Sequence, residues 1–313
     1  STPLFSATGK EPLNKYRLTH NVALNLVAAV QTVNNLVDIS TVSIKEKEQY
    51  DLFWHSSPCQ NFSLAGNNKG GDEGSGTSSS LLYESIRLIK ENTPKIVIWE
   101  NVKGALAKKH VHNVEKYKDE LSKLGYKHST EVISGDDVGW VQLRPRVFIY
   151  SYLEEENEIN LIDILKHQYN KVKLEKVIDF SKDSIKIPFE TSSVVVRNSK
   201  YARESFLKKG YDLETDNYVY DSGLSPSRPS RAYVGKTPTL LTSKRIAKYS
   251  AETKTETLLT AREYWSLMSF PADKYDLVNG EINDVHLYKI CGNSVLVLVI
   301  KEILKLNKML DKF

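Results

Sequence analysis

Cysteine is scarce in this chain, and no apolar run is long enough to span a bilayer. The 313 residues include two cysteines, Cys59 and Cys291. Two cysteines cannot form the disulfide framework of a small secreted domain, and they are too few for a cysteine-based metal site. The longest apolar run, residues 295–300, is far shorter than the ~20 residues of a transmembrane helix, and no basic-then-apolar signal pattern opens the sequence. We therefore expect a cytoplasmic protein that has no membrane partner.

The sequence also lacks a large excess of charge of either sign. Its formal net charge is +4, and 40% of the residues are hydrophobic and 26% charged, which is the composition of a globular protein. The length suffices for one large domain with a small one, or for two ordinary domains. A mildly positive charge permits a nucleic-acid partner without demonstrating one.

Three polar clusters lie next to apolar runs that have the length and composition of buried strands. The clusters are residues 58–60 (Pro-Cys-Gln), 100–102 (Glu-Asn-Val) and 142–146 (Gln-Leu-Arg-Pro-Arg), beside the apolar runs 50–55, 95–99 and 146–150. Open α/β sheets place their chemistry at the carboxyl ends of strands. A lone cysteine is more often an inert core residue, and a lone charged cluster is more often solvated surface. The order and spacing of all three clusters together favour a functional site.

The second half of the sequence shows no clean helical or strand period from about residue 160. Within it, residues 222–251 contain no acidic side chain. Their basic residues are Arg228, Arg231, Lys236, Lys244, Arg245 and Lys248. This segment is either a solvated basic surface or a set of phosphate and base contacts to nucleic acid, and the residues alone leave both interpretations open.

Helix signals are clear at four places. The predicted helices cover residues 79–90, 113–124, 264–268 and 295–310. Gly125 is the expected C-cap of the second helix. Thr260 and Glu263 have the spacing of a capping box, which predicts the start of the third helix. Ser294 is the expected N-cap of the last helix.

Taken in order, these motifs resemble those of the DNA (cytosine-5)-methyltransferase family of bacterial and phage modification enzymes. Residues 259–263 (Leu-Thr-Ala-Arg-Glu) with 269–271 (Ser-Phe-Pro), and residues 292–295 (Gly-Asn-Ser-Val), are similar to two further blocks of that family. The resemblance implies an α/β fold with a Rossmann-like S-adenosylmethionine-dependent methyltransferase domain and a second, smaller target-recognition domain. The implied boundaries are 1–160 for the catalytic domain, 161–284 for the target-recognition domain, and 285–313 for a C-terminal helix that returns to the catalytic domain.

The resemblance implies sequence-specific transfer of a methyl group from S-adenosylmethionine to C5 of cytosine in double-stranded DNA. In that reaction a thiolate adds to C6 of a base rotated out of the duplex, which makes C5 nucleophilic. Cys59 is the expected nucleophile, and it needs activation because a free thiol has a pKa of about 8.5. Glu100 is the expected acid at N3 of the ring. Arg144 is expected on the O2 side of the ring, with Arg146 in a supporting or phosphate-binding role.

The same resemblance implies which further residues bind the cofactor and the DNA. The expected S-adenosylmethionine-binding residues are Phe5, Gly9, Asp38, Ile39, Pro58, Leu81, Asn293 and Ser294. The expected DNA-binding residues are Gln60, Ser63, Arg228 and Arg231. The resemblance further implies a monomeric DNA-methylation enzyme, with a cognate restriction endonuclease as a candidate partner where the enzyme belongs to a restriction-modification system.

Two departures from the family pattern keep alternatives open. The family's cofactor turn reads F-x-G-x-G, whereas residues 5–9 read Phe-Ser-Ala-Thr-Gly, and the interval from Gly9 to Asp38 is short for a βαβ unit of ~30 residues or more. We expect that the natural chain carries further residues between Gly9 and Asn21, including an acidic ribose ligand. A true deletion would instead indicate a DNA-binding pseudoenzyme. A tRNA cytosine-5 methyltransferase is a third alternative, opposed by the lack of a Cys-Phe-Thr signature in residues 161–284.

Overall fold

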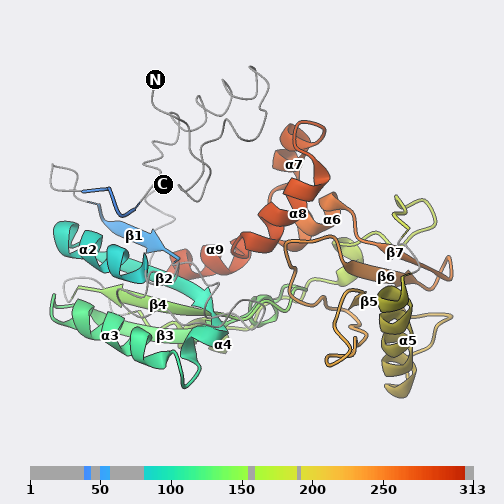
Figure 1. The fold of residues 1–313 in the computed structure, drawn as a ribbon, viewed down its shortest axis with the longest axis horizontal. Helices are drawn as coiled ribbons and strands as arrows, with labels where there is room; N and C mark the ends of the chain where they lie inside the picture. Colours follow the sequence, from blue (N-terminus) through green and yellow to red (C-terminus); the bar gives the residue numbers. More distant parts are fainter. Residues whose placement is uncertain (1–38, 44–49, 57–80, 154–158, 189–191, 307–313) are drawn as a thin grey trace. The chain divides into compact units, whose positions relative to one another are not determined.

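The computed structural model describes residues 39–43, 50–56, 81–153, 159–188 and 192–306 (Figure 1). The chain divides into two compact units: unit 1 comprises residues 1–130 and 147–158, and unit 2 comprises residues 131–146 and 159–313. Most of a four-stranded sheet belongs to unit 1, and a three-stranded sheet belongs to unit 2. The expected domain boundaries near residues 160 and 284 stay a prediction.

The sheet of unit 1 has the strand order β1-β2-β4-β3. The strands are β1 (Leu52–His55), β2 (Ile96–Val102), β3 (Lys127–Ile133) and β4 (Arg146–Tyr152). β1 runs parallel to β2, with Leu52 opposite Ile96 and His55 opposite Trp99. All of β2 except its last residue is buried, as expected for a strand whose sheet is covered on both faces. The three apolar runs predicted as strands are therefore confirmed as strands.

Helices α2 (Leu82–Asn92) and α3 (Val111–Ser122) accompany this sheet, and the short 3₁₀ helix η3 (Lys103–Leu106) follows β2 (Figure 1). The buried residues are Leu82, Ser85, Ile86, Leu88 and Ile89 on α2, and Asn113, Val114, Tyr117 and Leu121 on α3. The second predicted helix ends slightly earlier than expected. Gly125 takes a φ of 94° in the turn that follows, and its N–H donates to the carbonyl of Ser122 at 3.0 Å. Glycine suits this position because L side chains rarely adopt such a φ.

Unit 2 contains an antiparallel sheet of β5 (Tyr218–Asp221), β6 (Ile246–Ser250) and β7 (Thr255–Leu258), on which α5 (Ser193–Lys208) packs (Figure 1). The packed side chains are Ala202 and Phe206 of the helix and Tyr218, Tyr220, Ala247 and Tyr249 of the strands. The sequence shows no clean period here for a physical reason. The buried stripe of α5 is narrow and includes the polar Asn198, and β5 and β6 carry polar side chains at buried positions.

The other helices of unit 2 precede or follow the strands of this sheet along the chain. They are η4 (Gly135–Val138), α4 (Ile162–Lys166), η5 (Leu174–Lys176), α6 (Ala261–Leu267), α7 (Ala272–Val278), α8 (Asp284–Asn293) and α9 (Val297–Leu306). The predicted capping box of α6 is confirmed, because Thr260 Oγ1 accepts the Glu263 N–H at 3.2 Å and Glu263 Oε2 accepts the Thr260 N–H at 2.7 Å. The prediction for Ser294 is wrong. It is the C-cap of α8, whose helical hydrogen bonds run on until the Ser294 N–H donates to the carbonyl of Ile290.

The apolar core of unit 2 joins α6 and α8. Tyr264 and Tyr288 are fully buried there, edge to face, with ring centroids 4.7 Å apart. Val141 and Cys291 belong to the same core and directly precede two of the motifs, so its packing fixes the backbone at both. Burial raises the pKa of the Cys291 thiol to about 12, which keeps this cysteine protonated and unreactive. Across the described ranges, no helix is both long and apolar enough to cross a membrane.

Candidate active site

Glu100 lies near the carboxyl end of β2, beside Ser56, which is the first residue after β1. Its side chain is only 5% exposed, and Ser56 Oγ donates to Glu100 Oε2 at 2.8 Å. Because β1 and β2 are parallel, both strands end at the same edge of the sheet. The Pro-Cys-Gln motif begins two residues after Ser56 in the sequence. The hydrogen bond therefore ties the acid of one motif to the strand end that leads into another.

Several predicted site residues lie outside the described residues. They are Phe5, Gly9, Asp38, Pro58, Cys59, Gln60 and Ser63. The interval between Gly9 and Asn21, where additional natural sequence is expected, lies outside them as well. The roles assigned to these residues stay predictions.

A neutral histidine–tyrosine pair supports the strand end next to Glu100. His55, the last residue of β1, lies with Nε2 3.0 Å from the Tyr117 hydroxyl oxygen. Burial lowers the pKa of His55 to about 3, so the imidazole is uncharged at neutral pH. Burial also raises the pKa of Tyr117 well above its usual value. Sequence reasoning missed this pair, although a single polar residue inside an apolar strand was a visible signal.

Asn101, the second residue of the Glu-Asn-Val motif, is buried and serves the backbone. Its side chain is 1% exposed, and Oδ1 accepts the N–H of Val102 at 2.9 Å. This bond shapes the turn from β2 into η3. The motif thus combines a buried acid with an amide that bonds to the backbone at the end of β2.

Arg144 joins three segments of unit 2 through its buried guanidinium. Nη1 donates to the carbonyl of Leu240 at 3.0 Å, and Nη2 donates to the carbonyls of Gly292 and Ser294 at 2.7 Å each. The Arg144 N–H donates to Ser134 Oγ at 3.1 Å. The Gln-Leu-Arg-Pro-Arg and Gly-Asn-Ser-Val motifs, far apart in sequence, are therefore bonded to each other.

Gly292 allows this junction to close. A Cβ atom on Gly292 would lie 2.4 Å from the carbonyl carbon of Leu241 and 2.5 Å from the nitrogen of Thr242. Such distances are far inside van der Waals contact, and backbone atoms cannot yield as a flexible side chain can. Only glycine fits where α8 passes the segment before β6.

Gln142 and Arg146 flank Arg144 and differ from it in their contacts. The buried Gln142 donates from Nε2 to the carbonyl of Leu267 at 2.8 Å, and Trp140 Nε1 donates to the same carbonyl at 2.8 Å. Arg146 is half-buried, and its Nη1 donates to the carbonyl of the adjacent Pro145 at 3.0 Å. Gln142 thus fixes the motif to α6, and Arg146 bonds to the backbone of the motif itself.

Ser269 stands where the resembled family block has glycine, and the structure shows why glycine suits the place. Its φ is 55°, in the left-handed region that favours glycine. The serine offsets that strain with a useful hydroxyl, because Oγ accepts the N–H of Leu298 at 2.9 Å and donates to the carbonyl of Met268 at 2.7 Å. This departure from the family pattern therefore links the end of α6 to α9.

Four of the predicted cofactor residues are described. Ile39 and Leu81 are half-buried in unit 1, and the Ile39 carbonyl accepts from Arg87 Nη2 of α2 at 2.8 Å. Asn293 and Ser294 belong to unit 2, and Ser294 Oγ donates to the carbonyl of Ile290 at 2.7 Å. Among the residues placed by the structure, no group of three or more His, Cys, Asp or Glu side chains could hold a metal ion.

The basic segment 222–251 is not a uniform basic surface. Three of its cations form ion pairs inside unit 2: Lys236 with Asp136 at 2.9 Å, Arg245 with Asp221 at 2.6 Å, and Lys248 with Glu263 at 2.7 Å. The Lys248–Glu263 pair is almost fully buried. Four of the segment's cations are exposed: Arg228, Arg231, Lys244, and Lys236, which is the exposed member of its ion pair. The predicted DNA-binding residues Arg228 and Arg231 are thus exposed, and about half of the apparent basic surface has a structural use.

The fold is that of a mixed α/β methyltransferase, as expected from the sequence. The crystal structure of S. pombe Dnmt2 methyltransferase has the same fold, with a TM-score of 0.55 at 16% identity over 87% of this chain and 83% of that chain. At that identity the likeness concerns the fold alone.

The sequence comparisons define the family. The model of the C-5 cytosine-specific DNA methylase family matches residues 25–308, and the chain belongs to that family. It is 29% identical to the type II methyltransferase M2.ScrFI of Lactococcus lactis subsp. cremoris, over 87% of this chain and 70% of the relative. It is 32% identical to the orphan methyltransferase M.SssI of Spiroplasma monobiae, over 64% of this chain and 53% of the relative, so the chain spans about half the length of that protein. The resemblance drawn from the motifs is confirmed.

Proposed function

We propose that this protein transfers a methyl group from S-adenosylmethionine to C5 of cytosine in a specific sequence of double-stranded DNA. The observation that carries the proposal is the Ser56–Glu100 hydrogen bond at the shared end of β1 and β2. A nucleophile at C6 and an acid at N3 must act on one pyrimidine ring, so they need neighbouring strand ends. Cys59 follows β1 in the sequence, and Glu100 lies near the carboxyl end of β2.

The roles of the chain's residues follow from the chemistry of the ring. The Cys59 thiolate attacks C6, and Glu100 holds a proton at N3 so that the charge gathered by the ring is neutralised. C5 then carries electron density and would bond to the methyl group as the bond between that methyl and the donor's sulfonium sulfur breaks. Loss of the C5 proton to solvent, departure of the Cys59 thiolate from C6 and return of the N3 proton to Glu100 restore the aromatic ring. Ser56 fixes the carboxyl of Glu100 by donating to Oε2, which keeps the acid oriented before substrate binds.

The contacts of Arg144 and Arg146 support different roles for the two side chains. The buried Arg144 is bonded to three carbonyls, so we assign it to positioning the loops around the site. Arg146 keeps a half-buried guanidinium at the start of β4 and is the better candidate for contact with the O2 side of the ring or with phosphate. This proposal reverses the roles expected from the resemblance, and lysine substitutions at both positions distinguish the two assignments.

S-adenosylmethionine, when bound, supplies an electrophilic methyl group. We propose that Ile39 and Leu81 would hold it by apolar contact and Asn293 by its amide, together with Phe5, Gly9, Asp38, Pro58 and Ser294. The backbone at Ile39 is already fixed to α2 by Arg87, which suits a preformed pocket wall. We further propose a monomer that acts on DNA in the cytoplasm, with or without a cognate restriction endonuclease.

Bisulfite sequencing tests this function and reports the target at the same time. Plasmid DNA from cells that express the chain should carry 5-methylcytosine in one sequence context. DNA from cells that express Cys59→Ser should carry none, and the variant should not become trapped on DNA that contains 5-fluorocytosine. Unmethylated plasmid from cells with folded wild-type protein, combined with failure to bind S-adenosylmethionine, would favour the pseudoenzyme. Methylated tRNA with unmethylated DNA would favour the tRNA enzyme.

A further inference from the structure

The loop of residues 222–232 in unit 2 is closed at its base by the backbone. It begins where β5 ends at Asp221, and Tyr233 at its far end bridges back to Val219 of β5. The Val219 N–H donates to the Tyr233 carbonyl at 3.0 Å, and the Tyr233 N–H donates to the Val219 carbonyl at 2.9 Å. Both ends of the loop are therefore fixed to one strand.

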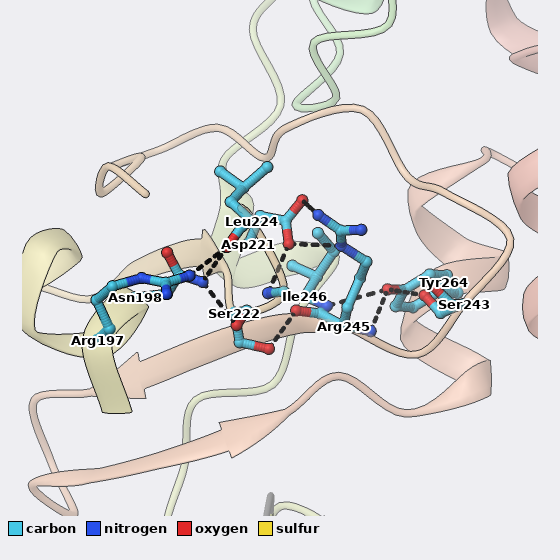
Figure 2. Close-up of polar contacts among 10 residues, drawn as sticks. Arg197, Asn198, Asp221, Ser222, Leu224, Ser243, Arg245, Ile246 and Tyr264 are labelled. Carbon is cyan, nitrogen blue, oxygen red and sulfur yellow. Dashed lines mark hydrogen bonds and ion pairs between the residues drawn. The ribbon is translucent and has the colours of Figure 1, made fainter. Parts of the chain in front are cut away.

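An ion pair braces the first residues of this loop (Figure 2). Arg245 donates from Nε and Nη2 to the two carboxylate oxygens of Asp221, at 2.6 and 2.7 Å. The Gly223 N–H adds a third bond to Asp221 Oδ1 at 2.9 Å. The N–H and hydroxyl of Ser222 both donate to the Arg245 carbonyl, at 2.9 and 2.7 Å. A bidentate pair with these extra bonds gives one defined geometry rather than a mobile contact.

Helix α5 holds the same loop from its other side (Figure 2). Asn198 is fully buried, and its Nδ2 donates to the carbonyls of Ser222 and Leu224 at 3.0 and 2.9 Å. Arg197 Nη2 donates to the Leu224 carbonyl at 2.7 Å. The sequence 225–231 that follows is thus carried on a rigid base, which is what precise recognition requires.

Arg231 is directed outward from this base and is itself held in place. Ser230 and Ala232 on either side are buried, whereas Arg231 is exposed. Its Nε donates to the Tyr233 hydroxyl oxygen at 3.0 Å, and its guanidinium carbon lies 5.1 Å from the centre of the Tyr233 ring. This bond uses Nε, so the N–H donors of the two terminal nitrogens are not needed for it. Two such parallel N–H donors match O6 and N7 of guanine in the major groove.

We propose that Arg231 is a specificity-determining residue that reads a guanine in the target sequence, and that Tyr233 is its positioning residue. The proposal rests on the proposed function, since it concerns the DNA which that function methylates. Stacking on tyrosine reduces the freedom that an arginine loses on binding, so the fork is preorganised for a base edge. A phosphate contact would use the same fork but would carry no sequence information.

The test is selection of bound duplexes from a random-sequence library, because it reports DNA recognition without methyl transfer. The wild-type protein should enrich one sequence that contains guanine at a fixed position. Arg231→Lys should lose that guanine preference by about tenfold, since a bidentate contact is replaced by a point charge, and should keep the rest of the sequence. Tyr233→Phe keeps the ring and removes the hydroxyl, so it should lose part of the same preference at the same position. Glu214→Gln, which removes an exposed ion pair with Lys254 in the same unit, is the matched control and should select the wild-type sequence.

Two results would overturn the proposal. Uniformly weaker binding of all sequences by Arg231→Lys or Arg231→Ala, with a shallower salt dependence, would identify a phosphate contact. An unchanged selection in both variants would show that Arg231 is solvated surface. Either result leaves the proposed function standing if wild-type protein methylates plasmid DNA. A plasmid that stays unmethylated beside an intact, Arg231-dependent selection would instead defeat the proposed function alone.

Discussion

The two sheets of this protein are stabilised in different ways. In unit 1, β2 reads Ile-Val-Ile-Trp before its polar end, and apolar burial holds it. In unit 2, β5 and β6 are just as buried yet contain Asp221, Lys248 and three tyrosines. The polar groups of that second sheet are satisfied by specific partners. In the four-stranded sheet the candidate functional residues therefore lie at the strand ends, whereas the antiparallel sheet contains hydrogen-bond networks within its strands.

Glu256 on β7 shows what the polar sheet requires. Its carboxylate accepts hydroxyl hydrogens from Ser199 at 2.6 Å, Tyr220 at 2.8 Å and Tyr218 at 3.0 Å. These donors come from α5 and β5, so one carboxylate connects the helix to the sheet. Such a network specifies one arrangement, and each missing partner leaves a buried polar group unpaired. We expect that exchanging one hydrophobic residue for another in the sheet of unit 1 lowers the stability less than replacing a polar residue of the network in the sheet of unit 2.

The largest effect should come from the end of β2 in the four-stranded sheet. Glu100→Gln cannot supply the proton at N3, so single-turnover methyl transfer should fall about 10²- to 10⁴-fold while thermal unfolding stays close to wild type. Ser56→Ala is the matched positioning variant. It should lose less, because the acid remains and only its orientation is released. Wild-type rates for Glu100→Gln would contradict its assigned role.

Within the antiparallel sheet, the largest loss of stability is expected at the buried Lys248–Glu263 pair. Lys248→Met leaves the Glu263 carboxylate buried without its cation and should destabilise unit 2 by about 3–5 kcal/mol, measured by urea unfolding. The exposed Lys254–Glu214 pair is the control, and Glu214→Gln should change stability by less than about 1 kcal/mol. Equal effects of the two substitutions would remove the contrast between buried and exposed charge in this sheet.

A smaller effect should appear in the pH dependence of unit 1. The His55 pKa is lowered to about 3 in the folded state from about 6.5 in the unfolded state, so between these values the unfolded chain binds more protons. Folding stability should therefore be independent of this group above pH 6.5. It should fall by up to about 1.4 kcal/mol per pH unit as the pH drops below that value. His55→Gln should show a shallower loss between pH 7 and 5 in urea unfolding, and identical slopes would contradict the assignment.

The parts of the fold that sequence analysis predicted are those with local signals. The apolar run of β2, the capping box of Thr260 and Glu263, and the strand-end position of Glu100 each depend on neighbouring residues. The carbonyl partners of Arg144 could not be predicted, since Leu240 and Gly292 are distant in sequence and a backbone carbonyl has no residue signature. The pairing of Arg245 with Asp221 was hidden for a similar reason. A window of 222–251 contains the cation but not its acid.

The prediction for Ser294 failed because two helices meet there. Serine suits the start of a helix, and the apolar run after it fits α9. The preceding residues of α8 continue to Asn293 on tertiary packing, with Cys291 in the core, so the serine ends a helix instead. The candidate site divides in the same way. Glu100 was predictable from its strand, whereas the bond from Ser56 that orients it needed the register of two strands.

The loop of residues 222–232 is attached to α5 through backbone carbonyls, and this has one further consequence. Asn198 and Arg197 bind main-chain carbonyls of Ser222 and Leu224, and every residue type offers a carbonyl. The tip between Ser225 and Arg231 can therefore change its side chains without loosening its attachment. If Arg231 has the role proposed above, substitutions confined to this tip can change the preferred DNA sequence while the attachment of the loop and the rest of the protein stay the same.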